Sequence, residues 1–135
     1  MSTRHHARRA IVQALYQWDL TQQAADEIEA SFSQIHDLQN VDKRFFRRVL
    51  KELPQVNAEL VTNISEFIER DINDLDPIER NILKLGAFEL GYRADVPTNV
   101  VINEMIELAK LFGADQSYKF VNSVMDKLAA RMRPS

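Results

Sequence analysis

Cysteine is absent from all 135 positions of the sequence, which excludes disulfide bonds, thiolate metal sites and thiol nucleophiles. Long hydrophobic runs are absent as well, because the uninterrupted apolar stretches are only a few residues long and a membrane-spanning helix needs about 20. The basic start of the chain has no apolar segment of signal-peptide length before Asp19. We therefore expect a cytoplasmic protein with no membrane partner.

The motifs of phosphate-binding loops, dinucleotide-binding folds and zinc proteases are missing too. The only histidines are His5, His6 and His36, and the adjacent His5 and His6 point to different sides of a helix, which makes a poor metal pair. No nucleophile is accompanied by an orienting base. The sequence thus predicts no catalytic residue, no metal site and no cofactor, and a protein that is not an enzyme.

Glycine and proline are scarce, with three glycines and four prolines in the chain. Apolar residues recur at helical spacing, and no segment sustains the alternation typical of a strand. This pattern predicts an all-α fold of six or seven helices. We expect a single domain over residues 1–135, made of two small packed helical sub-bundles at about residues 1–70 and 77–135.

Local signals predict where several helices begin and end. Pro54 must kink or break the long helical region over residues 42–71, because it lacks a backbone donor. Asp76 and Pro77 form a start signal, with the aspartate as the cap and the proline at the first helical position. Gly113 is expected to stop the next-to-last helix in a left-handed conformation, and Asp115 to begin the last helix.

Charge is unevenly distributed along the chain. The first ten residues contain three arginines and no acid, whereas the remaining residues contain 14 basic and 20 acidic side chains. An acidic body with a basic arm favours binding of the arm to phosphate or to an acidic partner. A frayed, solvated terminus gives the same charge pattern and stays open as the alternative.

The first helix combines this charge with an aromatic residue. A helical wheel places four side chains away from the apolar stripe, with Arg8 at its edge: His5, Arg9, Gln13 and Tyr16. Basic groups interleaved with an aromatic ring are typical of proteins that bind single-stranded nucleic acid, because the cations contact phosphate and the ring stacks on a base. A half-buried Tyr16 at the edge of the core is the alternative.

Phe120 lies outside the apolar stripe of the last helix, next to Lys127 and Arg131. The ring could pack beneath the aliphatic stems of these two side chains, which is the more common arrangement. It could instead form a platform on which a base stacks. The pattern alone leaves both interpretations open.

Four stretches of the sequence stand out as a set: "RRAIVQALYQWDL", "ERNILKLGAFEL", "DVPTNVVINEMIELAKLFGADQSYKFVNSVMD" and the closing "RP". Together they resemble the NusB family of bacterial transcription antitermination factors. The likeness covers nearly the whole chain and is strongest over residues 95–126. It implies an all-helical, NusB-like fold with two sub-bundles.

The resemblance also implies a function. Members of the family bind the boxA element of nascent RNA together with a small-subunit ribosomal protein, NusE. With other Nus factors they help RNA polymerase to read through terminators, especially in ribosomal RNA operons. Carried over position by position, the family's RNA surface comprises Arg4, Arg8, Arg9, Tyr16, Gln116, Ser117, Lys119 and Phe120, with Glu79 nearby.

This chain departs from the family pattern at a few of these positions. His5 and His6 stand within the family's run of arginines, and Gln116 stands where an acid is common. For the protein partner we expect the outer face of the helix over residues 98–112. There Val100 and Leu111 lie opposite the core stripe beside Glu104 and Glu107, and an apolar pair rimmed by acids suits a basic ribosomal protein.

Two other functions fit parts of the pattern. NusB-like domains also precede the catalytic part of some ribosomal RNA cytosine methyltransferases, but such an enzyme needs a cofactor domain and normally a cysteine, and this sequence has neither. A helical protein-interaction module without an RNA role, including a homodimer, is the second alternative. Failure to distinguish boxA from scrambled RNA would favour it.

Overall fold

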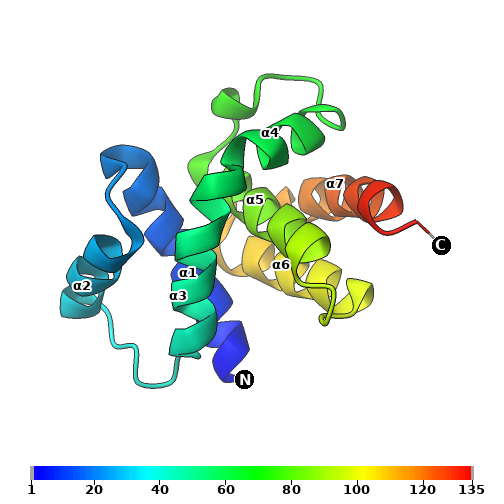
Figure 1. The fold of residues 1–135 in the computed structure, drawn as a ribbon. Helices are drawn as coiled ribbons and strands as arrows, with labels where there is room; N and C mark the ends of the chain where they lie inside the picture. The colour runs from blue at the N-terminus through cyan, green and yellow to red at the C-terminus, as the bar shows by residue number, and fades with distance from the viewer. Residues whose placement is uncertain (1, 135) are drawn as a thin grey trace. The chain divides into compact units, whose positions relative to one another are not determined.

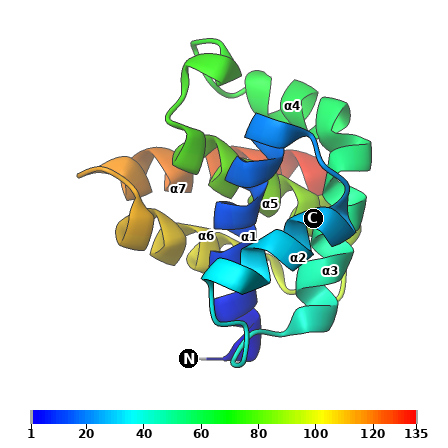
Figure 2. The same cartoon turned by 90° about the vertical axis from the view of Figure 1, so that its left-hand side faces the viewer.

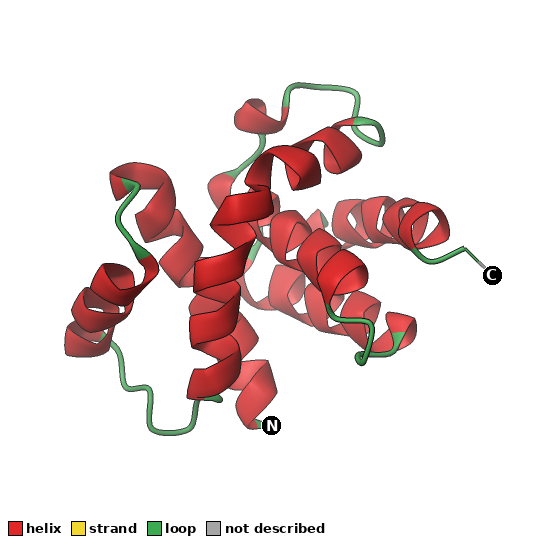
Figure 3. Ribbon diagram, viewed as in Figure 1, coloured by secondary structure: helices red, strands yellow, loops and turns green. Residues whose placement is uncertain are grey.

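The structure, a computed structural model, describes residues 2–134 and contains helices and loops but no strand within that range (Figure 3). The α-helices are α1 (Thr3–Thr21), α2 (Ala25–Ile35), α3 (Lys43–Glu52), α4 (Asn57–Ser65), α5 (Pro77–Tyr92), α6 (Thr98–Phe112) and α7 (Ser117–Met132). Two short 3-10 helices, η1 (Leu53–Val56) and η2 (Ile72–Asp74), flank α4. The predicted all-α fold and the predicted number of helices are confirmed. None of these helices is long and apolar enough to cross a membrane.

The chain divides into two compact units, Met1–Val56 and Asn57–Ser135 (Figure 1). This division falls earlier than the boundary near residue 70 that we expected from the sequence. The difference lies in α4, which packs against α5 and α7 of the second unit. Pro54 lies in η1, directly after α3, so the predicted break in the long helical region is confirmed. That the two units form one domain remains a prediction.

In the first unit, α2 and α3 both pack against α1 (Figures 1 and 2). The rings of Phe32 in α2 and Phe46 in α3 lie 5.8 Å apart between centroids. Asp42 joins the start of α3 to the start of α1. Its side chain accepts a hydrogen bond from the Phe45 N–H (3.1 Å), and its own N–H donates to the Thr3 carbonyl (3.0 Å).

In the second unit, α5 is the central helix and contacts α4, α6 and α7 (Figure 1). All of its residues from 81 to 90 are buried. Gly86 allows α7 to approach closely, because a Cβ atom at this position would lie 2.5 Å from the Met125 sulfur. Arg133 holds the end of α5 by donating hydrogen bonds to the carbonyl oxygens of Glu89, Leu90, Arg93 and Val96, at 2.6–3.1 Å. The last carbonyls of a helix have few partners within it, and this clasp supplies further donors there, although the Glu89 and Arg93 carbonyls also accept hydrogen bonds from the Arg93 and Val96 N–H groups.

The predicted helix signals are partly confirmed. Asp76 caps α5 by accepting hydrogen bonds from the N–H groups of Ile78 and Glu79, and Pro77 occupies the first helical position. The prediction for Gly113 is wrong, because its φ of −79° lies outside the left-handed region. Glycine is required there by space instead: a Cβ atom would lie 2.7 Å from both the Ala109 carbonyl oxygen and the Ser117 hydroxyl.

Candidate nucleic-acid interface

The residues predicted to contact RNA fall into two sets, one in each unit. Six lie on α1 in the first unit: Arg4, His5, Arg8, Arg9, Gln13 and Tyr16. The others lie at the starts of α5 and α7 in the second unit: Glu79, Gln116, Ser117, Lys119 and Phe120. Each set is described within its own unit.

The helix that carries the first set begins with a cluster of basic residues. Ser2 caps α1, and its hydroxyl accepts a hydrogen bond from the His5 N–H (3.1 Å). The first turn contains no acidic side chain. Cations near a helix N-terminus are unfavourable by about 0.3–1 kcal/mol each when exposed. The intrinsic stability of α1 as a helix therefore does not explain why basic residues cluster at its start.

The six side chains on α1 differ in how far they are exposed to solvent. Arg9 is exposed and Tyr16 is 43% exposed, which favours the open rather than the half-buried interpretation of the tyrosine. His5 and Arg8, by contrast, are only 7% and 3% exposed. Positions 5, 8, 12 and 15 follow helical spacing and are all buried, so they form one buried ridge on α1. The expectation that His5 shares the open face with Arg9 is therefore wrong.

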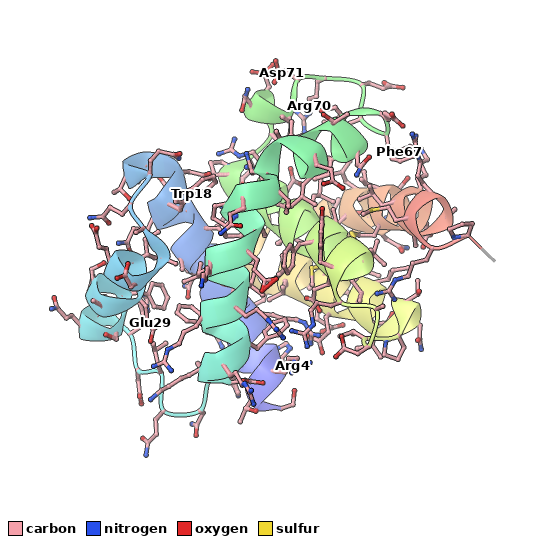
Figure 4. All side chains as sticks on the ribbon, viewed as in Figure 1. Arg4, Trp18, Glu29, Phe67, Arg70 and Asp71 are labelled. Atoms are coloured by element: carbon pink, nitrogen blue, oxygen red, sulfur yellow. The ribbon has the colours of Figure 1, made fainter. Side chains whose placement is uncertain are left out.

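Arg4 and Arg8 face the same aromatic ring. The guanidinium carbon of Arg4 lies 4.5 Å from the centre of the Phe45 ring, and that of Arg8 lies 5.5 Å from it. Arg4 also forms an ion pair with Asp42 at 3.4 Å, so it links the start of α1 to the start of α3 (Figure 4). A cation over a ring face is stabilised by about 0.5–2 kcal/mol. Both arginines thus contribute to the packing of the first unit.

In the second unit, two of the predicted residues meet directly. The Ser117 hydroxyl donates a hydrogen bond to the Glu79 carboxylate at 2.6 Å, and this bond ties the first turn of α7 to the first turn of α5. Ser117 is buried and its hydroxyl is used internally. Gln116, directly before α7, adopts the left-handed conformation (φ 71°) and is exposed. The last helix therefore begins at Ser117, later than the predicted start at Asp115.

Phe120 is partly exposed and lines a hollow of about 490 Å³ within the second unit. The opposite wall is formed by residues 67–70, in the loop after α4, where Figure 4 labels Phe67 and Arg70. Lys127 lies along the same hollow, as the sequence suggested, but Arg131 instead forms an ion pair with Glu66.

Sequence analysis missed Phe67 and Arg70, because they lie in a loop without periodicity and only the folded chain places them opposite α7. Lys119, the remaining member of the second set, is exposed on α7.

The expected protein-binding face lies on α6. Val100 and Leu111 are 37% and 50% exposed, which agrees with their predicted position opposite the core stripe. Glu107 is exposed and forms an ion pair with Lys110 at 3.8 Å, whereas Glu104 is half-buried. Across residues 2–134, no three His, Cys, Asp or Glu side chains are arranged to hold a metal ion.

Comparison with known proteins gives one consistent result. The model of the NusB family matches residues 5–130. The transcription antitermination protein NusB of Hahella chejuensis is 46% identical over 133 residues, covering 98% of this chain and 89% of that protein. A crystal form of T. maritima NusB superposes with a TM-score of 0.83 and 33% identity, covering 99% of this chain and 96% of that one. A crystal structure of the antitermination factors NusB and NusE in complex with double-stranded RNA superposes with a TM-score of 0.76 and 25% identity, over 96% and 97% of the two chains.

Proposed function

Since the chain belongs to the NusB family, we propose that it acts in transcription antitermination by binding RNA together with a small-subunit ribosomal protein, NusE. The observation that carries this proposal is the match over nearly the whole chain to antitermination proteins, one of which was solved with NusE and RNA. The family consists of non-enzymatic factors, in agreement with the prediction that this chain is not an enzyme. In this proposal, the RNA target of the chain is the boxA element of nascent ribosomal RNA transcripts. The chain works in the cytoplasm with RNA polymerase and other Nus factors.

The exposed members of the predicted set contact the RNA in this proposal. Arg9 and Lys119 neutralise phosphate, which makes binding depend on salt. Tyr16 and Phe120 offer ring faces to bases, and each stacked base contributes about 1–3 kcal/mol. The solvent exposure of these residues supports their assignment as RNA contacts, since all four side chains are exposed or partly exposed.

The less accessible members of the set have a supporting role. Arg8 packs over Phe45, and Arg4 packs there while pairing with Asp42, so both hold the start of α1 in place. The hydrogen bond from Ser117 to Glu79 fixes the first turn of α7, from which Lys119 and Phe120 project. His5 lies on the buried ridge of α1, while Gln13 and Gln116 offer amide groups beside the exposed contacts.

NusE binds to the outer face of α6 in this proposal. Val100 and Leu111 supply apolar area, and Glu104 and Glu107 supply negative charge for a basic ribosomal protein. Because RNA and NusE bind the same molecule, each increases the affinity of the other by linkage, typically by about 1–3 kcal/mol.

The test is a titration of boxA RNA and of scrambled RNA, with and without NusE, at two salt concentrations. We expect boxA to bind more tightly than scrambled RNA and NusE to increase its affinity. Reversing the charge of Glu104 and Glu107 should weaken NusE binding while RNA binding by the isolated protein stays nearly unchanged. Equal affinity for both RNAs would support an interaction module without an RNA role. If NusE affinity is unchanged after charge reversal, NusE binds to a face other than the outer face of α6.

A further inference from the structure

A second hollow, of about 250 Å³, opens within the first unit between α1 and the segment that joins α2 to α3. One wall is formed by His6, Arg9 and Gln13 of α1. The other wall is formed by Phe32 and His36 and by residues 37–41. Most of these side chains, His36 among them, do not belong to the RNA surface that the family resemblance implies.

The far wall presents a ring that is anchored to the core. The imidazole of His36 stacks on the ring of Phe32, with centroids 4.2 Å apart and an interplanar angle of 20°. Phe32 is itself buried and contacts Phe46, whereas His36 is exposed. A flat ring that is backed by a second ring on one side is suited to stack a third planar group. Nucleic bases are planar groups of this kind.

The near wall supplies groups for an anion. Arg9 and His6 lie on α1, where the amide of Gln13 offers a hydrogen-bond donor and acceptor, and the amide of Asn40 offers the same from the opposite wall. Asp37 is the one carboxylate among the residues that line the hollow, and it lies on the opposite wall, where its Oδ1 accepts a hydrogen bond from the Gln39 N–H (2.9 Å). A phosphate is therefore favoured on the side of α1. A planar ring with an attached anion describes a nucleotide.

The two walls are held in place before any ligand binds. The Asp42 N–H donates to the Thr3 carbonyl at 3.0 Å, and Asp42 also pairs with Arg4, so the end of the loop is joined to the start of α1. Leu38 anchors the middle of the loop because its side chain is buried. A preformed site loses less conformational freedom when it binds.

We propose that this hollow binds one unpaired nucleotide of the RNA, with the base against His36 and the phosphate at Arg9 and His6. The inference rests on the proposed function. Arg9, Gln13 and Tyr16 follow one another at helical spacing, so the hollow adjoins the exposed tyrosine and its nucleotide flanks the one at Tyr16. Its volume lies just below the range of about 300–1,000 Å³ typical of small-molecule sites, which suits a single nucleotide rather than a peptide or a duplex.

The experiment compares synthetic boxA RNA with the same RNA carrying two extra unpaired nucleotides at its 5′ or its 3′ end. We expect one of the two extensions to increase affinity about five-fold or more, as stacking of one base would. Replacing the extra nucleotides by abasic ones, or His36→Ala, should cancel this gain. His36→Phe should keep it, because the ring is retained. Gln34→Ala, at an exposed neighbouring position outside the hollow, is the matched control and should keep the gain as well.

A direct signal comes from 2-aminopurine placed in the extension. Its fluorescence should be quenched on binding to the unaltered protein and much less on binding to His36→Ala. Binding of the unextended RNA with no gain from either extension, or a gain that survives His36→Ala, would overturn this inference and leave the proposed function standing. If boxA RNA is bound neither with nor without an extension, the proposed function fails, and this inference fails with it.

Discussion

The two units present different chemistry at the surfaces proposed for RNA. On α1 of the first unit, basic residues outnumber the one exposed aromatic ring, Tyr16, and two of the arginines pack over Phe45. In the second unit, two phenylalanines, Phe67 and Phe120, line one hollow together with Arg70 and Lys127. Charge dominates the first surface, and aromatic area has a larger share of the second.

This difference separates two contributions to binding. Contacts between cations and phosphate depend strongly on salt and carry no information about sequence. Stacking on an aromatic ring depends little on salt and positions an individual base. In the proposed function each unit offers both kinds of contact, Arg9 with Tyr16 in the first unit and Lys119 with Phe120 in the second. Removing a cation and removing a ring should therefore change different measured quantities.

The largest expected effect comes from removing the clasp at the end of α5. Arg133→Ala would remove four hydrogen bonds to carbonyl oxygens in and after the last turn of α5, of which those of Glu89 and Arg93 also accept from a backbone N–H, and we expect the free energy of unfolding to fall by about 2–4 kcal/mol. Urea unfolding followed by circular dichroism measures this. Arg131→Ala is the matched control, since this arginine lies two positions earlier, in the last turn of α7. Its exposed ion pair with Glu66 should contribute less than about 1 kcal/mol. Equal losses in both variants would mean that the clasp stabilises the second unit no more than a surface ion pair does.

The next effect concerns the aromatic contribution of the second unit. Phe120→Ala should weaken boxA binding about ten-fold or more, because one stacked base is lost. The slope of log affinity against log salt should stay unchanged, since no phosphate contact is removed. Fluorescence anisotropy at several salt concentrations measures both quantities.

The same variant separates the two interpretations of the Phe120 ring. Truncation of a fully buried phenylalanine costs about 3–5 kcal/mol of stability, whereas Phe120 is partly exposed and should cost much less. If the variant unfolds several kcal/mol more easily and its folded fraction binds RNA normally, Phe120 belongs to the core and does not stack on a base.

Local signals in the sequence were sufficient for much of the fold. Pro54 and the pair Asp76–Pro77 act through their own backbone, so their effects on helix ends could be predicted without a structure. The sequence predicted that Gly113 ends α6, but it did not show why glycine is needed there, because the close approach of Ser117 exists only in the folded chain.

The candidate site was less predictable. A wheel of α1 alone could not show that neighbouring elements cover His5 and Arg8. Phe67 and Arg70 carry no periodic signal in their loop, so only tertiary structure places them beside Phe120. Sequence thus identified the helices that carry the site, and packing decided which of their side chains are accessible.

A smaller effect tests the contribution of charge in the first unit. Arg9→Ala should reduce the salt slope of RNA binding by about one unit, because one phosphate contact is lost. Affinity should fall by a similar factor for boxA and for scrambled RNA, unlike the effect of Phe120→Ala. Arg44→Ala is a suitable control, since this arginine is also exposed but lies on α3, outside the proposed surface. An unchanged slope for Arg9→Ala would show that Arg9 does not contact phosphate.

The smallest effect is a dependence on alkaline pH that arises in the second unit. The Tyr92 hydroxyl donates a hydrogen bond to Glu59, and this bond, with burial and the negative charge of Glu59, raises the pKa of Tyr92 above its ordinary value of 10.0. A group whose pKa is raised by folding stabilises the folded state below its unfolded pKa and loses this contribution as pH rises through its folded pKa. The contribution of Tyr92 is therefore present at pH 8 and lost above about pH 10.

Tyr92→Phe should lower the free energy of unfolding by less than about 1 kcal/mol at pH 8, because the hydrogen bond lies at the surface. Above pH 10 the difference between the variant and the unaltered protein should shrink. Urea unfolding at pH 8, 9, 10 and 11 measures this convergence. Glu59→Gln is the matched variant, since it keeps an acceptor for the hydroxyl but removes the charge, and it should reduce the alkaline loss as well. A constant difference between Tyr92→Phe and the unaltered protein over this range would show that the hydrogen bond to Glu59 does not couple tyrosine ionisation to folding of the second unit.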